Sequence, residues 1–297
     1  MAEDTSRPPD PKIVQRVVEA ALLEDGARSD VTTKAVVPDG EVGRAAIIAK
    51  EGGVLAGLPV AEAVFAALDA TVRFAPLVPD GSVICPGDRL VEIEGALSPI
   101  LSGERVALNF LQQLSGVATA THDLVEAVAG LNVRSDGQGP ARIIDTRKTT
   151  PGLRELERYA VRLGGGQNHR FNLSDGVLIK DNHIAAARDR DLTIAQIVEL
   201  ARRNVAHTFR VEIEVTTREE AREALGAGAD AILLDNMSVA DMRHVVEDVG
   251  GRAITEASGG VTIDTVREIA ETGVDLISVG GITHSAPALD LSLELET

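Results

Sequence analysis

The sequence predicts an α/β protein in which a parallel α/β barrel follows a smaller domain. The length of 297 residues exceeds that of a typical single domain but falls short of two large ones. After Gly130, short β-branched runs alternate with helical patterns. Strands and helices that alternate in this way form parallel βαβ units, and a series of such units favours a barrel.

The part of the chain before Gly130 mixes one helix with short strands. The pattern predicts a helix over 12–23 and strands over 43–50, 72–78 and 90–94, with tight turns at 80–81 and 86–88. The segment 79–95 is similar to the hairpin of biotinyl and lipoyl carrier domains. No lysine stands at its turn to carry a prosthetic group, so we interpret this part as a small sheet domain.

A long helix is predicted to join the two domains. Ser98 is a suitable N-cap, Pro99 is favoured at the first helical position, and apolar residues recur at helical spacing as far as Val125. The charged pair Glu104-Arg105 lies beside this apolar stripe. It is either a solvated helix face or part of a binding site.

The second part of the chain supplies the strands of the barrel. Thr217 and Ser238 each stand three residues before an acidic residue, as in helix capping boxes. Gly226 and Gly228 are expected to end a helix as left-handed caps. The tail 288–296 alternates apolar and polar residues and is expected to return to the first domain as a strand. The predicted barrel strands are 142–145, 177–179, 211–215, 231–234, 253–255 and 276–279.

Composition excludes several classes of function. The formal net charge of −17 disfavours a general polyanion-binding surface, so nucleic acid is a poor candidate partner. The single cysteine, Cys85, rules out an intramolecular disulfide and favours a reducing compartment. The polar stretch 1–10 lacks an apolar signal core, and no apolar run approaches ~18 residues. We therefore expect a cytoplasmic protein with no membrane partner.

Basic residues gather in one short stretch of this acidic chain. Arg147-Lys148, Arg170 and Lys180 fall within 34 residues. Because the rest of the chain is acidic, a local cluster of cations predicts an anionic ligand.

The candidate binding and catalytic residues stand at the ends of the predicted barrel strands. The loops after parallel strands open onto one face of a barrel, where catalytic groups stand. Cations, two carboxylates and two glycine turns would therefore share one mouth. The glycine turns suit phosphate, and the carboxylates suit Mg²⁺. The residues concerned are Asp145 to Lys148, Lys180, Glu214, Asp235-Asn236, Ser258-Gly259-Gly260 and Gly280-Gly281.

Two other kinds of site are excluded. The triple glycine 164–166 does not match a dinucleotide fingerprint and has no strand before it. His169 and His183 lack the spacing of transition-metal ligands. Hydrogen bonding to a ligand is the expected use of these histidines.

Several motifs together resemble quinolinate phosphoribosyltransferase, the carboxylating nicotinate-nucleotide pyrophosphorylase of NAD synthesis. They are the segments 146–154, 164–170, 178–183 and 257–260. The resemblance extends from Glu24-Asp25 to 283–285, although the run 24–30 is looser than the family's pattern. It implies a type II phosphoribosyltransferase that converts quinolinate and 5-phosphoribosyl-1-pyrophosphate to nicotinate mononucleotide, pyrophosphate and CO₂.

The resemblance also implies an architecture. An N-terminal α/β sandwich domain, 1–117 with the tail 285–297, would be joined to an incomplete, open TIM-like α/β barrel over 118–284. The chain would form a homodimer with shared active sites, or a hexamer of such dimers, in which one subunit's N-terminal domain closes over the other's barrel.

The same resemblance assigns roles to individual residues. Quinolinate would be bound by Arg105 of the partner subunit together with Thr146, Arg147, His169, Arg170 and Lys180. The phosphoribosyl donor would be bound by Lys148, Glu214, Asp235, Ser258, Gly259, Gly260, Val279, Gly280 and Gly281. Lys148, Glu214 and Asp235 would be catalytic, and Glu214 and Asp235 would hold Mg²⁺ as the cofactor.

Three other interpretations stay open at the level of sequence. Lys180 at a strand end would suit a Schiff-base aldolase, although Asp181 beside it works against the lowered pKa that such a lysine needs. A phosphosugar-binding regulatory protein would lack a DNA-binding module here. A related phosphoribosyltransferase with another acceptor, such as the relative associated with molybdenum transport, is the nearest rival.

Overall fold

The computed structural model describes residues 7–131 and 139–296, so residues 1–6 of the polar N-terminal stretch lie outside the described part. The chain forms two compact units. The first contains Met1–His122, Lys148–Gly165 and Gly281–Thr297, and the second contains Asp123–Arg147 and Gly166–Gly280. The domain boundaries implied by the resemblance stay a prediction. Within the described ranges, no helix has the length and apolar character needed to cross a membrane.

The first unit is built around an antiparallel sheet with the order β12-β1-β5-β3. The C-terminal strand β12 pairs with β1, with Leu291 opposite Ala49, so the predicted return of the tail is confirmed. A second, two-stranded sheet joins β2 to β4. The bounds are β1 Val42–Ala49, β2 Gly53–Val54, β3 Arg73–Pro76, β4 Val83–Ile84, β5 Arg89–Ala96 and β12 Leu291–Glu296.

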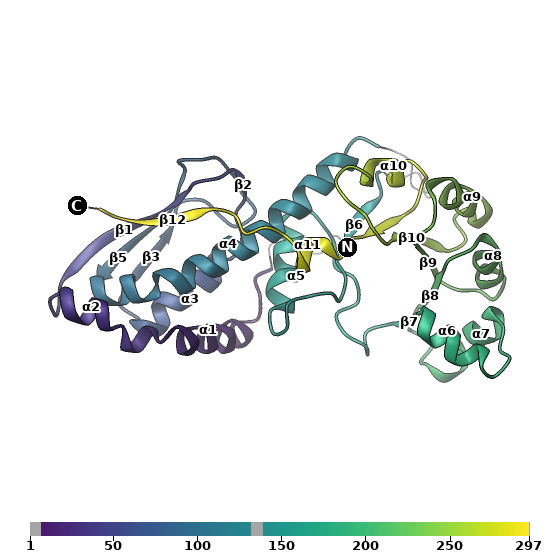
Figure 1. The fold of residues 1–297 in the computed structure, drawn as a ribbon, viewed down its shortest axis with the longest axis horizontal. Coiled ribbons are helices and arrows are strands. Elements are labelled where there is room, and N and C mark those ends of the chain that lie inside the picture. Colours follow the sequence, from purple (N-terminus) through teal and green to yellow (C-terminus); the bar gives the residue numbers. More distant parts are fainter. Residues whose placement is uncertain (1–6, 132–138, 297) are drawn as a thin grey trace. The chain divides into compact units, whose positions relative to one another are not determined.

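Helices α1, α2 and α3 and the first part of α4 accompany this antiparallel sheet, whereas α5 and α11 of the same unit lie away from it (Figure 1). The rings of Phe65 in α3 and Phe74 in β3 stack with their centroids 5.9 Å apart, so helix and sheet share one apolar core. Asp10 caps α1 by accepting a hydrogen bond from the Lys12 amide. The helices are α1 Pro11–Asp25, η1 Ala27–Ser29, α2 Val31–Val36, α3 Leu58–Leu68, α4 Leu97–Val128, α5 Arg154–Leu163 and α11 Gly281–His284.

The long helix α4 begins earlier than the sequence predicted. It starts at Leu97, so Ser98 lies inside the helix and is not its N-cap. Pro99 still falls in the first turn, where a missing backbone N–H breaks no helical hydrogen bond. Further along, the backbone of Pro287 passes so close to Gly116 that any side chain there would collide with it.

A half-buried carboxylate ties α5 to α3. Asp80 accepts hydrogen bonds from the Gly57 amide at 3.0 Å, the Leu58 amide at 3.2 Å and the Tyr159 hydroxyl at 2.8 Å. Burial raises the pKa of Asp80, and these hydrogen bonds act in the opposite direction. Asp80 thereby caps the start of α3 and anchors α5 with one side chain.

The second unit contains a six-stranded parallel sheet with the order β6-β11-β10-β9-β8-β7. In the described part of the chain the sheet keeps two edges, β6 and β7, so it is an open barrel-like sheet, as predicted. Its strands are β6 Arg142–Ile144, β7 Val177–Ile179, β8 Val211–Val215, β9 Ala231–Asp235, β10 Ile254–Ser258 and β11 Leu276–Ser278.

One strand of this sheet is longer than predicted. The sequence placed a strand at 253–255, whereas β10 continues to Ser258, with Glu256 buried in it. The residues Glu, Ala and Ser have low strand propensity, but pairing with β9 and β11 on both sides overrides that preference.

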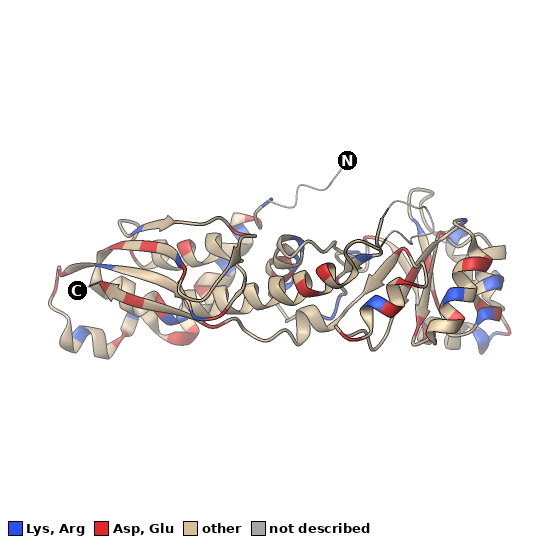
Figure 2. Ribbon diagram, turned by 90° about the horizontal axis from the view of Figure 1, so that it is seen from above, with Lys and Arg blue, Asp and Glu red and all other residues tan. Residues whose placement is uncertain are grey.

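Helices connect the strands of the second unit and flank them on one side (Figure 1). Thr217 and Ser238 cap α8 and α9, as predicted. Gly226 is the last residue of α8 and not a left-handed cap, a conformation that Gly228 adopts instead with φ 78°. The helices are α6 Asp181–Arg188, α7 Ile194–Asn204, α8 Arg218–Gly226, α9 Val239–Val249 and α10 Val266–Ala270. Acidic and basic residues are interspersed in both units (Figure 2).

Candidate functional site

The carboxyl ends of the six parallel strands lie at one edge of the second unit. Parallel pairing fixes this, because every strand points the same way. Most of the predicted site residues stand at or just beyond these ends. The exceptions are Arg105, Lys148 and Gly281, which belong to the first unit.

Asp145 organises the loop that carries two of these residues. The side chain is fully buried and accepts hydrogen bonds from Asn168 Nδ2 at 2.8 Å and from the His169 amide at 2.7 Å. The Gln167 amide donates to the Ile143 carbonyl at 2.8 Å, so segment 167–169 runs along the edge strand β6. The loop is thereby held against the sheet next to Arg147.

Arg147 and Arg170 form the cationic centre of the site. Burial, and after it the positive charge of Arg147, lowers the pKa of Arg170, which means that the two guanidinium groups act on each other. Arg170 Nη1 donates to the Gly176 carbonyl at 2.8 Å. The buried Nε atoms of both arginines have no hydrogen-bond partner among the residues that the structure describes. Unsatisfied buried donors on two adjacent cations fit an anionic ligand.

His169 links the loop that carries Arg170 to acids on the sheet. Its Nδ1 accepts a hydrogen bond from the Arg170 amide at 2.6 Å. Its Nε2 lies 3.3 Å from Glu212 Oε2 and 3.6 Å from Glu256 Oε2. Burial lowers the pKa of His169, but the hydrogen bond to Glu212 and the charges of Glu256, Glu212 and Asp145 outweigh it, so that the pKa is raised.

Glu256 is the most buried member of this cluster. Its side chain is 1% exposed, and neither carboxylate oxygen has a hydrogen-bond partner in the described part of the chain. Burial, followed by the charge of Glu212, raises the pKa of Glu256 to about 8, while the charge of His169 acts in the opposite direction. One ligand atom from each of His169, Glu212 and Glu256 lies within 4.8 Å of the others. The spacing of His169 along the chain gave no sign of this cluster.

A second charged group stands at the ends of β7, β8 and β9. Lys180 Nζ lies 3.7 Å from Glu214 Oε2. Burial raises the pKa of Glu214, Lys180 lowers it, and the charges of Asp235 and Asp181 raise it further. A carboxylate under repulsion from two neighbouring acids is suited to binding a cation.

The ends of β9 and β10 are joined by a close contact. The Asn236 amide donates to the Ser258 carbonyl at 2.9 Å, and Asn236 Nδ2 donates to Asp235 Oδ2 at 2.8 Å. Gly259 has φ 93°, and a side chain there would collide with that of Asn236. Only glycine therefore permits this approach, which brings the turn 258–260 beside Asp235.

The remaining predicted residues lie near β6 or in the first unit. The Val279 amide donates to the Ile144 carbonyl at 3.0 Å, so Val279 and Gly280 follow β11 beside the start of the loop that carries Thr146. Arg105 lies on α4 with its side chain 60% exposed, and its Nη2 is 3.9 Å from Glu104 Oε1. Lys148 accepts a hydrogen bond from Thr283 Oγ1 at its carbonyl oxygen, at 2.7 Å.

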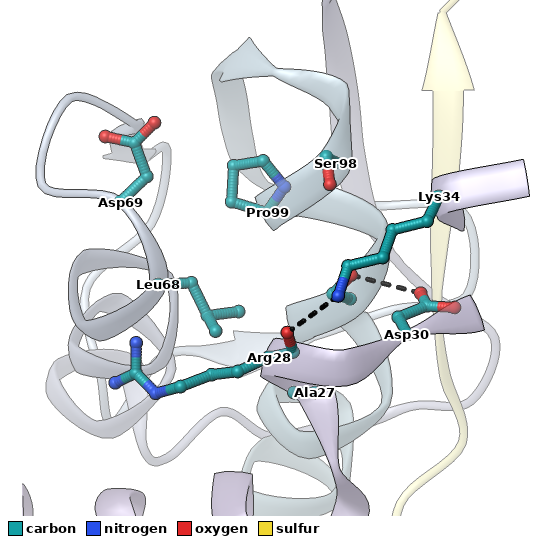
Figure 3. A pocket seen from close by; sticks show the side chains of 9 residues that line it. Ala27, Arg28, Asp30, Lys34, Leu68, Asp69, Ser98 and Pro99 are labelled. Atoms are coloured by element: carbon teal, nitrogen blue, oxygen red, sulfur yellow. Dashed lines mark hydrogen bonds between the residues drawn. The ribbon is translucent and has the colours of Figure 1, made fainter. Parts of the chain in front are cut away.

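The first unit contains a separate pocket of about 360 Å³, lined by nine residues of η1, α2, α4 and the end of α3 (Figure 3). Its polar groups bond to each other. Lys34 Nζ donates to the Arg28 carbonyl at 3.2 Å, and Ser102 Oγ donates to Asp30 at 3.0 Å. Asp30 also caps α2 through the amides of Thr32 and Thr33. These contacts give the loosely matching run 24–30 a structural role.

Sequence reasoning missed the acids beneath the site. Glu212 and Glu256 each stand two residues before a predicted site residue on the same strand. Alternate residues of a strand share a face, so this spacing places them under Glu214 and Ser258. A charged residue in the interior of a predicted strand was the signal that would have revealed them.

Comparison with known proteins places the whole chain in one family. Residues 117–294 match the family model of the quinolinate phosphoribosyl transferase C-terminal domain, and residues 30–115 match that of the N-terminal domain. A probable nicotinate-nucleotide pyrophosphorylase [carboxylating] of Bacillus subtilis is 39% identical over 95% of this chain and 93% of its own length. A quinolinate phosphoribosyltransferase [decarboxylating] of Nicotiana tabacum is 39% identical over 96% of this chain and 82% of its own.

Solved structures are similar over the same extent. NadC from Streptococcus pyogenes superposes with a TM-score of 0.89 at 40% identity, covering 98% of this chain and 100% of that chain. The nicotinate-nucleotide pyrophosphorylase from Francisella tularensis gives a TM-score of 0.89 at 36% identity and covers both chains completely.

Proposed function

The chain belongs to the quinolinate phosphoribosyltransferase family, and we propose that the loops at the carboxyl ends of β6 to β11 hold its two substrates. It is a decarboxylating phosphoribosyltransferase of NAD biosynthesis. Quinolinate and 5-phosphoribosyl-1-pyrophosphate are converted to nicotinate mononucleotide, pyrophosphate and CO₂.

The unsatisfied guanidinium donors support the assignment of the quinolinate pocket. Arg147 and Arg170 are adjacent cations, each with a buried Nε donor that has no partner in the described residues. The two neighbouring carboxylates of quinolinate supply acceptors for both. Lys180 neutralises further negative charge from the end of β7, and Thr146 and His169 complete the pocket wall.

Glu214 and Asp235 are proposed to face the ribose and the metal ion. Both offer carboxylate oxygens, the ligands that Mg²⁺ prefers, and the pKa of Glu214 is raised first by burial and then by the charges of Asp235 and Asp181, against the opposing charge of Lys180. This donor set fits Mg²⁺, which when bound would neutralise the pyrophosphate. The two carboxylates also stabilise positive charge that develops at the anomeric carbon as the pyrophosphate leaves.

The glycine turns are proposed to bind the phosphate of the donor. Gly259 and Gly260 have φ angles of 93° and 61°, which only glycine adopts readily, and their side-chain-free backbone allows an anion to approach the amides. Ser258 is proposed to join them, and Val279 and Gly280 after β11, with Gly281 at the start of α11, are proposed to supply further backbone amides. Lys148 is proposed to contact the phosphoribosyl donor and its leaving pyrophosphate.

The reaction requires the protein to position its two substrates and to neutralise charge, and it needs no covalent bond to an enzyme residue. The pyridine nitrogen attacks the anomeric carbon, and the ribosylated nitrogen becomes positively charged. That charge stabilises the carbanion left when the neighbouring carboxylate departs as CO₂, and the carbanion then takes up a proton from solvent to give nicotinate mononucleotide. The residues of the pocket hold the ring in line with the donor, a contribution that lowers the entropic part of the barrier.

A homodimeric assembly and a cytoplasmic location are also proposed. A homodimer with shared active sites is supported by Arg105, a cation with an exposed side chain on α4 in the first unit, apart in sequence from the other cations. A cytoplasmic location is supported by the single cysteine, Cys85, which is exposed and free.

A pyrophosphate-release assay with quinolinate and nicotinate side by side tests the function. Nicotinate lacks the 2-carboxylate and leaves a charged donor unpaired. The loss of one charge-assisted hydrogen bond costs about 1.5–3 kcal/mol, or roughly 10- to 150-fold in kcat/KM. Equal kcat/KM for the two acids would overturn the dicarboxylate pocket. Borohydride trapping of Lys180 with a carbonyl substrate would instead reveal an aldolase.

A further inference from the structure

Glu256 is a buried acid beside His169, under the loop that carries Arg170 in the quinolinate pocket. Glu256 lies in the middle of β10, a strand with neighbours on both sides, and its carboxylate is buried without a hydrogen-bond partner in the described chain. Its Oε2 lies 3.6 Å from His169 Nε2. A buried carboxyl group without a hydrogen bond lowers the stability of the folded protein, so a functional reason for its presence is expected.

His169 connects this buried acid to the loop that carries Arg170. The 2.6 Å contact with the Arg170 amide requires an unprotonated Nδ1. The ring proton then resides on Nε2, directed at Glu212 and Glu256. The acids that raise the pKa of His169 favour a second proton, but that proton would break the contact with Arg170. The hydrogen bond that Nδ1 accepts thus selects the tautomer in which Nε2 carries the proton that faces Glu212 and Glu256.

We propose that Glu256 is a positioning residue: its carboxyl group faces His169 Nε2–H beyond hydrogen-bond distance, and together with the nearer Glu212 it keeps the ring oriented by electrostatic attraction and thereby fixes the peptide of Arg170 in the quinolinate pocket. This proposal rests on the proposed function of that pocket. A metal ion held by His169, Glu212 and Glu256 is the competing use of the same atoms. It is disfavoured because a ring nitrogen that carries a proton cannot bind a metal.

Steady-state kinetics of Glu256→Leu against both substrates tests the proposal. Leucine has a similar volume but offers no acceptor. We expect the KM for quinolinate to rise roughly tenfold, with the KM for phosphoribosyl pyrophosphate unchanged. Glu256→Gln is the matched control, because its amide oxygen still presents a polar acceptor atom towards Nε2–H, and we expect a smaller rise. If Glu256→Leu does not fold, Glu256→Asp replaces it, since its shorter side chain draws the carboxyl group away from His169.

Nitrogen NMR of the histidine side chains gives a readout that a merely structural role would not change. The chain has six histidines, and the His169 signal is identified by its loss in His169→Gln. We expect the Nε2–H tautomer in the wild type and in Glu256→Gln, and a mixture of tautomers in Glu256→Leu.

Three results would overturn the proposal. They are an unchanged KM for quinolinate in Glu256→Leu, an equal rise for both substrates, and a bound metal ion that is lost in Glu256→Leu but kept in Glu214→Gln. A wild-type protein that releases no pyrophosphate with quinolinate would instead refute the proposed function, and the tautomer measurement would still decide the role of Glu256.

Discussion

Glu256→Gln removes a buried ionisable group while keeping the shape of the side chain, and we expect it to change how stability depends on pH. The pKa of Glu256 is raised to about 8, mainly by burial, from a usual value of 4.5. Between these values the folded state holds a proton that the unfolded state has released. The stability of the wild type therefore falls as pH rises through this window.

The slope of this effect is set by the number of protons involved. One proton corresponds to about 1.4 kcal/mol per pH unit, so the contribution of Glu256 changes by at most about 3 kcal/mol between pH 5.5 and 7.5. In Glu256→Gln this contribution disappears.

Thermal unfolding of the two proteins between pH 5.5 and 7.5 measures this difference. We expect the Tm of Glu256→Gln, relative to that of the wild type, to increase by several degrees across the range. Glu219→Gln serves as the control, because the Glu219 side chain is 81% exposed and its ion-pair partner, Arg222, keeps its charge throughout this range, so the pH dependence should be unchanged. A Tm difference that is the same at every pH would show that Glu256 is ionised in the folded protein and would refute the reasoning.

Three further outcomes are expected. Glu214→Gln and Asp235→Asn should depress kcat far more than the affinity for quinolinate measured by calorimetry, because their charge is needed beside the ribose; wild-type turnover in both variants would remove them from the mechanism. Mixing inactive Arg105→Ala and Lys180→Ala chains should restore part of the activity, since a mixed dimer holds one intact site; a mixture that stays inactive although mixed dimers form would contradict the shared site. Asp80→Ala should destabilise the protein by about 2–4 kcal/mol, because two amides and a hydroxyl lose their half-buried acceptor, and a Tm unchanged in thermal unfolding would exclude that role.

The sequence by itself determined the fold class and most of the strand ends. Periodicity located the parallel strands, and because the carboxyl ends of such strands share one edge, Arg147, Lys180 and Glu214 could be assigned to a common site from their positions in the chain. The return of the tail as β12 was equally visible, because alternation of apolar and polar residues is a local signal.

Tertiary structure alone decided what lies beneath the site. The extension of β10 to Ser258 depends on pairing with β9 and β11, an interaction that no local propensity records. The cluster of His169, Glu212 and Glu256 joins residues that are distant in the chain and meet only when the sheet forms. Burial raises the pKa of Glu256 for the same reason, because desolvation is a property of the packed interior and not of the residue.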